Sequence, residues 1–136
     1  MLRISKLTDY AILILSYLAR QPEGVLSATS LAEILHLGVP TVSKVLKMLS
    51  DANLVNALRG AEGGYRLSKP AAEIKLVEII VALEGDIAVT ECSEKLNLCA
   101  LEAQCTMRHN WQQINRGVRD YLAQFSLRDM LQPLVV

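Results

Sequence analysis

Apolar residues recur at helical spacing near the start of the chain. Within residues 5–20 they fall three or four positions apart, which predicts an amphipathic first helix. The sequence QPEG at 21–24 then ends the pattern, since proline and glycine stop a helix. The expected inward positions are Leu7, Ala11, Ile14, Leu15 and Leu18.

The next apolar run predicts a second, shorter helix over residues 28–36. Ser27 is the expected N-cap, because a serine hydroxyl can accept a hydrogen bond from a free amide of the first turn. A capping box of Ser30 with Glu33 is the alternative. The expected inward positions are Leu31, Ile34 and Leu35.

The sequence HLGVP predicts a tight turn followed by a third helix over about 40–51. Gly38 is expected to take the left-handed conformation just past the second helix, and Pro40 suits the first turn of the third. Two short helices joined by a glycine-containing turn form the helix-turn-helix pattern. The expected inward positions of the third helix are Val42, Val45, Leu46 and Leu49.

The opposite face of the third helix carries residues suited to DNA. In a helix-turn-helix, the second helix of the pair enters the major groove with its N-terminal residues nearest the bases. Thr41 and Ser43 are short enough to approach base edges, whereas Lys44 and Lys47 can meet phosphates. An ordinary helical hairpin with solvated lysines would show the same pattern.

The segment NLVNALRGAEGGYRLSKP predicts a β-hairpin, with strands over about 54–58 and 65–67. A hairpin directly after a recognition helix is a wing, and Arg59 at its glycine-rich tip can reach a phosphate or the minor groove. Tyr65 is the second candidate DNA contact of this wing. A surface hairpin whose glycines only make the turn is the alternative. Helix, turn, helix and wing in this order predict a winged helix-turn-helix.

A short helix is expected over 76–84, with Val77, Ile80, Val81 and Leu83 packed inward and Gly85 ending it. A long helix is expected over about 104–125, where apolar residues repeat at alternating spacings of four and three. This seam packs either along the first helix or against a second copy. We expect a two-fold dimer, because a chain of this size has little core left to bury it. The seam residues are Met107, Trp111, Ile114, Val118, Tyr121 and Phe125.

Composition supports a mainly α-helical fold with a small β-wing: 51% of the 136 residues are hydrophobic but only 4% are aromatic. The net charge of zero hides an asymmetry. Residues 1–70 carry eight Lys/Arg and five Asp/Glu, whereas residues 71–136 carry six and nine, so the basic first half is the part expected to approach DNA. No apolar stretch reaches the length of a membrane span, and no export signal is seen, which predicts a cytoplasmic protein. No catalytic set emerges, so neither an enzyme nor a small-molecule substrate is expected.

All the cysteines lie in residues 90–106, as Cys92, Cys99 and Cys105. Thiolates are soft ligands for zinc, copper(I) or iron–sulfur clusters. Structural zinc sites use close cysteine pairs, whereas these intervals of seven and six residues suit a loop around the larger cluster. Zinc, bare redox-sensing thiols and buried small side chains are the alternatives.

The segments LRISKLTDYAILIL, LAEILHLGVPTVSKVLKMLSDANLV and RGAEGGYRLSKP resemble the Rrf-two family of bacterial winged-helix regulators, as do IKLVEIIVALEGD and SLRDML. This family includes IscR- and NsrR-like repressors and the regulators of SUF iron–sulfur assembly genes. The resemblance covers essentially the whole chain. It implies a DNA-binding unit over 1–70, a connecting helix over 71–89, a sensor loop over 90–106, and a dimerisation helix with its tail over 107–136.

The same resemblance implies an iron–sulfur cluster, 2Fe–2S rather than 4Fe–4S, held by Cys92, Cys99 and Cys105. The fourth ligand would be Asp9 of the partner subunit or His109. It also implies a homodimer that reads paired half-sites of a double-stranded operator and represses SUF-type genes. A nitric-oxide- or redox-responsive repressor of the same fold, and a zinc-bound or metal-free protein-interaction module, are the other hypotheses.

Overall fold

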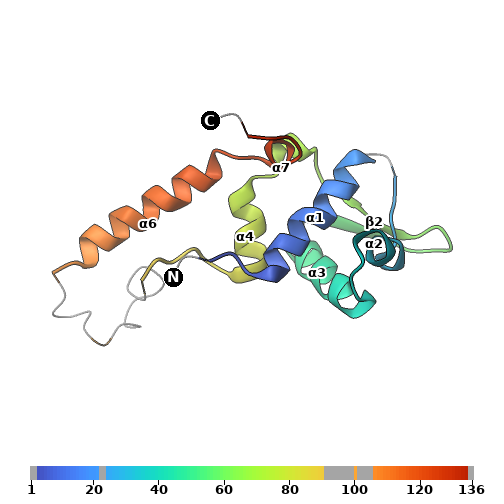
Figure 1. Cartoon of the computed structure of the whole chain (residues 1–136), viewed down its shortest axis with the longest axis horizontal. Helices are drawn as coiled ribbons and strands as arrows, with labels where there is room; N and C mark the ends of the chain where they lie inside the picture. Colours follow the sequence, from blue (N-terminus) through green and yellow to red (C-terminus); the bar gives the residue numbers. More distant parts are fainter. Residues whose placement is uncertain (1–2, 22–23, 91–99, 101–105, 135–136) are drawn as a thin grey trace.

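The computed structural model describes residues 3–21, 24–90, 100 and 106–134. Helices α1–α4 and a two-stranded antiparallel sheet gather into one body, and helix α6 extends away from it (Figure 1). This is the predicted architecture, mainly α-helical with a small β-wing. None of the helices in these described ranges is long and apolar enough to cross a membrane. The elements are α1 (Lys6–Arg20), α2 (Ala28–Leu35), α3 (Val39–Asp51), β1 (Val55–Leu58), β2 (Gly64–Leu67), the 3₁₀ helix η1 (Ala71–Glu73), α4 (Leu76–Glu84), α6 (Arg108–Ala123) and α7 (Leu127–Met130).

The first two helices begin where the sequence predicts. Ser5 caps α1 by accepting the Thr8 amide at 3.2 Å, and Ser27 caps α2 by accepting the Ser30 amide at 3.1 Å. The cap of α2 is therefore Ser27, not the alternative Ser30. On α2 the predicted inward Ile34 is wrong: it is 39% exposed, while Ala32 is buried beside Leu31.

The turn between α2 and α3 differs from the prediction. His36 takes the left-handed conformation (φ 56°, ψ 42°), whereas Gly38 is extended and caps α3. Because α2 ends at Leu35, the reversal falls on the next residue, and the Leu37 amide closes it by donating to the Ala32 carbonyl at 3.0 Å. Histidine tolerates this conformation better than most residues.

The core lies between α1, α3 and α4. All four predicted inward residues of α3 are fully buried. On α4 the predicted face is partly wrong, because Val77 and Val81 are only half-buried. The helix packs against both α1 and α3, so its buried side is wider and rotated toward Leu76 and Ile79. The buried residues of α4 are Leu76, Ile79, Ile80 and Leu83.

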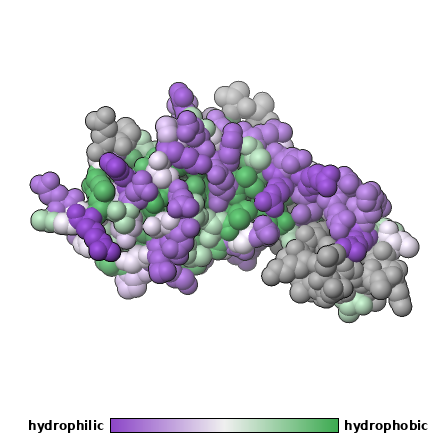
Figure 2. Space-filling model, turned by 180° about the vertical axis from the view of Figure 1, so that it is seen from behind, coloured by the Kyte–Doolittle hydropathy of each residue, from purple (hydrophilic) through white to green (hydrophobic). Residues whose placement is uncertain are grey.

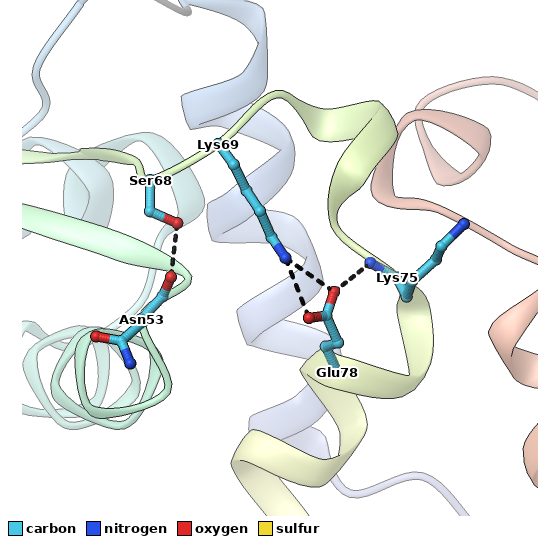
Figure 3. Close-up of polar contacts among 5 residues, drawn as sticks. All are labelled: Asn53, Ser68, Lys69, Lys75 and Glu78. Carbon is cyan, nitrogen blue, oxygen red and sulfur yellow. Dashed lines mark hydrogen bonds and ion pairs between the residues drawn. The ribbon is translucent and has the colours of Figure 1, made fainter.

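Glu78 completes the N-terminus of α4. Its carboxylate accepts the Lys75 amide at 2.7 Å and pairs with the Lys69 ammonium at 3.1 Å, and nearby Ser68 donates to the Asn53 carbonyl at 2.6 Å (Figure 3). Burial raises the pKa of Glu78, but the Lys75 amide and the Lys69 ammonium outweigh it, so the net pKa lies below the usual 4.5. The carboxylate form therefore stabilises the fold.

We expect this stabilisation to disappear in acid. Because the folded pKa of Glu78 is lowered, its contribution is present above pH 4.5 and is lost as the pH falls through the lower folded value. Glu78→Gln should therefore lower the free energy of unfolding at pH 7 but not at pH 3, as measured by urea denaturation. Glu73→Gln, on the neighbouring η1, is the control that should change neither. An equal loss for Glu78→Gln at both pH values would contradict the assignment.

Helix α6 is shorter than predicted. It begins at Arg108 and ends at Ala123, rather than spanning 104–125, and residues 104 and 105 lie outside the described ranges. Its C-terminal end is joined to the body by two backbone hydrogen bonds, from the Leu76 amide to the Phe125 carbonyl (2.9 Å) and from the Leu127 amide to the Ile74 carbonyl (2.8 Å). No residue of α6 itself is buried.

Candidate nucleic-acid interface

Helix α3 presents a polar face to solvent because the apolar positions beyond its first turn face the core. Ser43, Lys44 and Lys47 are exposed, and Thr41 is half-buried in the first turn. The two lysines lie about one turn apart. The Lys47 ammonium lies 3.5 Å from Asp51, and since both side chains are largely exposed, this pair restrains Lys47 only weakly.

The N-terminus of α3 carries a residue that the sequence analysis did not single out. Val39 is the first residue of the helix and is 42% exposed. An apolar side chain at the leading end of such a helix can contact the methyl group of thymine. In the sequence HLGVP this valine directly precedes the proline, but helical periodicity alone does not say whether its side chain points into the core or toward solvent.

The wing is a short hairpin with its tip at residues 59–63. Strands β1 and β2 pair from Val55 opposite Leu67 to Leu58 opposite Gly64. Arg59 directly follows β1 and is exposed, so its guanidinium can extend from the tip. In Figure 1 the hairpin projects beyond α2 while α3 lies along the lower edge of the body.

Two backbone contacts attach the wing to the segment before α2. The Leu26 amide donates to the Tyr65 carbonyl at 3.1 Å, and the Tyr65 amide donates to the Leu26 carbonyl at 2.8 Å. A Cβ atom on Gly64 would lie 2.6 Å from the Leu26 carbonyl oxygen, so glycine is needed there for close backbone approach.

Tyr65 occupies a different position from the other candidate DNA contacts. Its side chain is half-buried and packs against the core, so it supports the wing from within. Its predicted contact with DNA stays a prediction.

The predicted metal ligands are only partly placed. Cys92, Cys99 and Cys105 all lie outside the described residues. Within the described ranges, no three His, Cys, Asp or Glu side chains gather closely enough to hold a metal ion. The donor chemistry predicted for this stretch therefore rests on the sequence.

The two candidate fourth ligands both lie on exposed first turns. Asp9 is exposed near the start of α1, beside an open depression that it lines with Arg3, Ile4 and Lys6. His109 is exposed near the start of α6. Each side chain is accessible to a ligand from outside its own helix. Asp9 also fits the simpler role of an acidic residue at a helix N-terminus.

Comparison with known proteins agrees with this arrangement. The sequence matches the model of the Rrf2 family, described as an iron-dependent transcriptional regulator, over residues 4–133. The transcriptional regulator NsrR of Oceanobacillus iheyensis is 29% identical over 136 residues, covering 96% of this chain and 90% of that protein. Both descriptions name transcriptional regulators, in agreement with the predicted regulator and the expectation that the chain is not an enzyme.

Solved structures share the fold. CymR (YrzC), the global cysteine regulator of B. subtilis, superposes with a TM-score of 0.74 at 31% identity, over 96% of this chain and 97% of CymR. IscR of T. potens superposes with a TM-score of 0.68 at 30% identity, over 96% of this chain and 86% of IscR.

Proposed function

We propose that this chain, which belongs to the Rrf2 family of DNA-binding transcriptional regulators, is a cytoplasmic, iron–sulfur-responsive repressor of SUF-type iron–sulfur assembly genes. The observation that carries this proposal is the confinement of all three cysteines to one stretch between α4 and α6. The family description as iron-dependent supports it. The choice of SUF-type genes rests on the resemblance of the sequence motifs.

DNA recognition is assigned to α3 and the wing. With α3 in the major groove, Thr41 and Ser43 read base edges, while Lys44, Lys47 and Arg59 meet phosphates. The exposure of the three cations supports this assignment. The partner is a double-stranded operator, and residues 1–70 form the part that binds it.

The proposed active form is a homodimer joined through α6. Along this helix and at its N-cap, four large seam residues are exposed: Met107 at 56%, Trp111 at 38%, Ile114 at 49% and Tyr121 at 58%. An apolar stripe of this length on a projecting helix favours a second copy over water. Figure 2 shows mainly hydrophilic residues over α6 on the face turned toward the viewer. The connecting helix over 71–89 and the dimerisation segment over 107–136 complete the proposed layout.

The stretch over 90–106 is the proposed sensor. Cys92, Cys99 and Cys105 supply three thiolates, and the fourth ligand is Asp9 of the partner subunit or His109. When bound, a cluster would supply a redox-active centre, and its oxidation or loss would be the signal. We favour 2Fe–2S over 4Fe–4S. The consequence for the chain is a shift between two arrangements of the paired DNA-binding units.

Anaerobic purification of the wild type beside Cys99→Ala tests the sensor. We expect a coloured wild type that contains iron and acid-labile sulfide, and a variant that loses most of both, because one of three thiolate ligands is gone. Visible absorption and elemental assays measure this. Asp9→Ala and His109→Ala, prepared in parallel, assign the fourth ligand, and the exposed Gln113→Ala serves as the control.

A colourless wild type without sulfide, even after reconstitution with iron and sulfide, would contradict the cluster. A zinc assay then separates a zinc-bound module from a metal-free chain, and DNA retardation separates either interaction module from the second candidate described next. Such a module would also fail to retard DNA.

A thiol-redox or nitric-oxide-responsive repressor is the second candidate. It is favoured by the structural similarity to CymR, whose description is a global cysteine regulator. A nitric-oxide-responsive repressor would release DNA when nitric oxide destroys a bound cluster. A repressor with bare thiols in the same stretch would instead release DNA on oxidation, without any bound iron.

A further inference from the structure

The side chain of Asn115 joins α6 to the segment that follows α4. Its amide nitrogen donates to the Ile87 carbonyl at 3.0 Å, and its amide oxygen accepts the Val89 amide at 2.9 Å. One side chain thus satisfies a donor and an acceptor of the same backbone segment. One turn further along α6, the Arg119 guanidinium lies 3.6 Å from the Asp86 carboxylate, an exposed and weaker contact.

The start of this segment is fixed to α1. The Glu84 carboxylate accepts the Thr8 hydroxyl at 2.8 Å and the Ser5 amide at 3.2 Å. Thr8 is fully buried, so this hydrogen bond satisfies its hydroxyl inside the protein. Gly85 follows with φ 82° and ψ −166°, a conformation that only glycine adopts readily, and it turns the chain from α4 toward α6. Residues 84–89 therefore form a brace between α1 and α6.

The brace gives α6 a second point of attachment. The first is the pair of backbone hydrogen bonds beyond its C-terminal end, at Phe125 and Leu127. Asn115 lies eight residues before Ala123, which is about 12 Å along the helix axis. A helix held at one end can pivot, whereas a helix held at two separated points has a fixed tilt. Helix α6 also packs against α4, but none of its residues is fully buried, so the polar contacts of its side chains contribute to this tilt beside the packing.

We propose that Asn115 is a positioning residue that fixes the tilt of α6 relative to the DNA-binding unit, and thereby the spacing of the two half-sites that the dimer accepts. This inference rests on the proposed DNA-binding dimer. Arg108 lies about 23 Å from Ala123, so a change of about 10° in tilt moves that end of α6 by about 4 Å. One base-pair step of DNA is about 3.4 Å. A change of about 10° in tilt therefore displaces the end of α6 by about the length of one base-pair step, the smallest change in half-site spacing.

The test compares full-length wild type, Asn115→Ala and the control Gln113→Ala, an exposed residue of the same helix whose side chain makes no hydrogen bond to the described residues. An operator is first selected by the wild type from random duplexes. Its half-sites are then separated by inserting or deleting one or two base pairs, and a duplex with a single half-site is included. Sedimentation confirms that each protein remains in the same oligomeric state.

We expect the wild type and Gln113→Ala to lose roughly tenfold in affinity for each base-pair change, the scale of a mismatched base pair. Asn115→Ala should vary by less than about threefold across the same series, with its affinity for the single half-site unchanged. Hydrogen exchange at the Val89 amide should accelerate in Asn115→Ala alone, because its acceptor is removed.

The single half-site separates this role from a merely structural one. A general loss of folding would lower the affinity for every duplex. A helix α6 that is free to pivot would change only how the affinity depends on half-site spacing. Faster exchange at Val89 with an unchanged spacing profile would overturn the inference, as would a wild type indifferent to spacing. Failure of the wild type to select any duplex would instead remove the proposed DNA-binding function, and the inference with it.

Discussion

Replacement of Leu127 by alanine is expected to lower the free energy of unfolding by about 2–5 kcal/mol. This is the usual range when a buried leucine is truncated and a cavity is left in the core. Leu127 is fully buried and is the one buried residue of α7. Its side chain joins the core, while its amide donates to the Ile74 carbonyl at 2.8 Å. Urea denaturation followed by circular dichroism measures the change.

Met130→Ala is the matched control. It removes an apolar side chain from the same short helix, but Met130 is 36% exposed, so a change within about 1 kcal/mol is expected. A similarly small loss for Leu127→Ala would show that α7 is not docked in solution. The C-terminal end of α6 would then lack the anchorage described above.

The second large effect is expected on DNA affinity. Lys44→Ala combined with Lys47→Ala should weaken operator binding by roughly 10- to 100-fold, since in the proposed complex each lysine supplies a charged contact to phosphate. The slope of log affinity against log salt should fall by about 1.8, or 0.9 for each lost phosphate contact. Replacement of Lys47 also removes the cation that lies 3.5 Å from the Asp51 carboxylate. Fluorescence anisotropy across a salt series measures both quantities.

A charge-matched double variant tests whether the position of the lysines matters. Arg116→Ala with Arg128→Ala removes two exposed cations from α6 and the short helix after it, away from α3 and the wing. Its salt slope should remain close to that of the wild type. Equal losses for the two double variants would mean that net charge alone drives binding, and α3 would not be the recognition helix.

Hydrophobic periodicity by itself determined most of the elements. Helices α1, α2 and α3 begin within one residue of their predicted starts, and all four predicted core positions of α3 are buried. This follows because a helix boundary and an apolar stripe are local properties, fixed by capping residues and by the 3.6-residue repeat. The exposed lysines of α3 also follow from this pattern, whereas Arg59 was placed by the glycines at the tip of the wing.

Only the tertiary structure decided which residues meet across the chain. Val77 and Val81 fit the sequence pattern as well as Ile79, but the packing of α4 between α1 and α3 selects the buried side. No periodic pattern connects Asn115, Glu84 and Thr8, and they became linked only when α1, α4 and α6 were placed together. Polar contacts between residues distant in sequence leave no periodic trace, because their geometry is created by the fold.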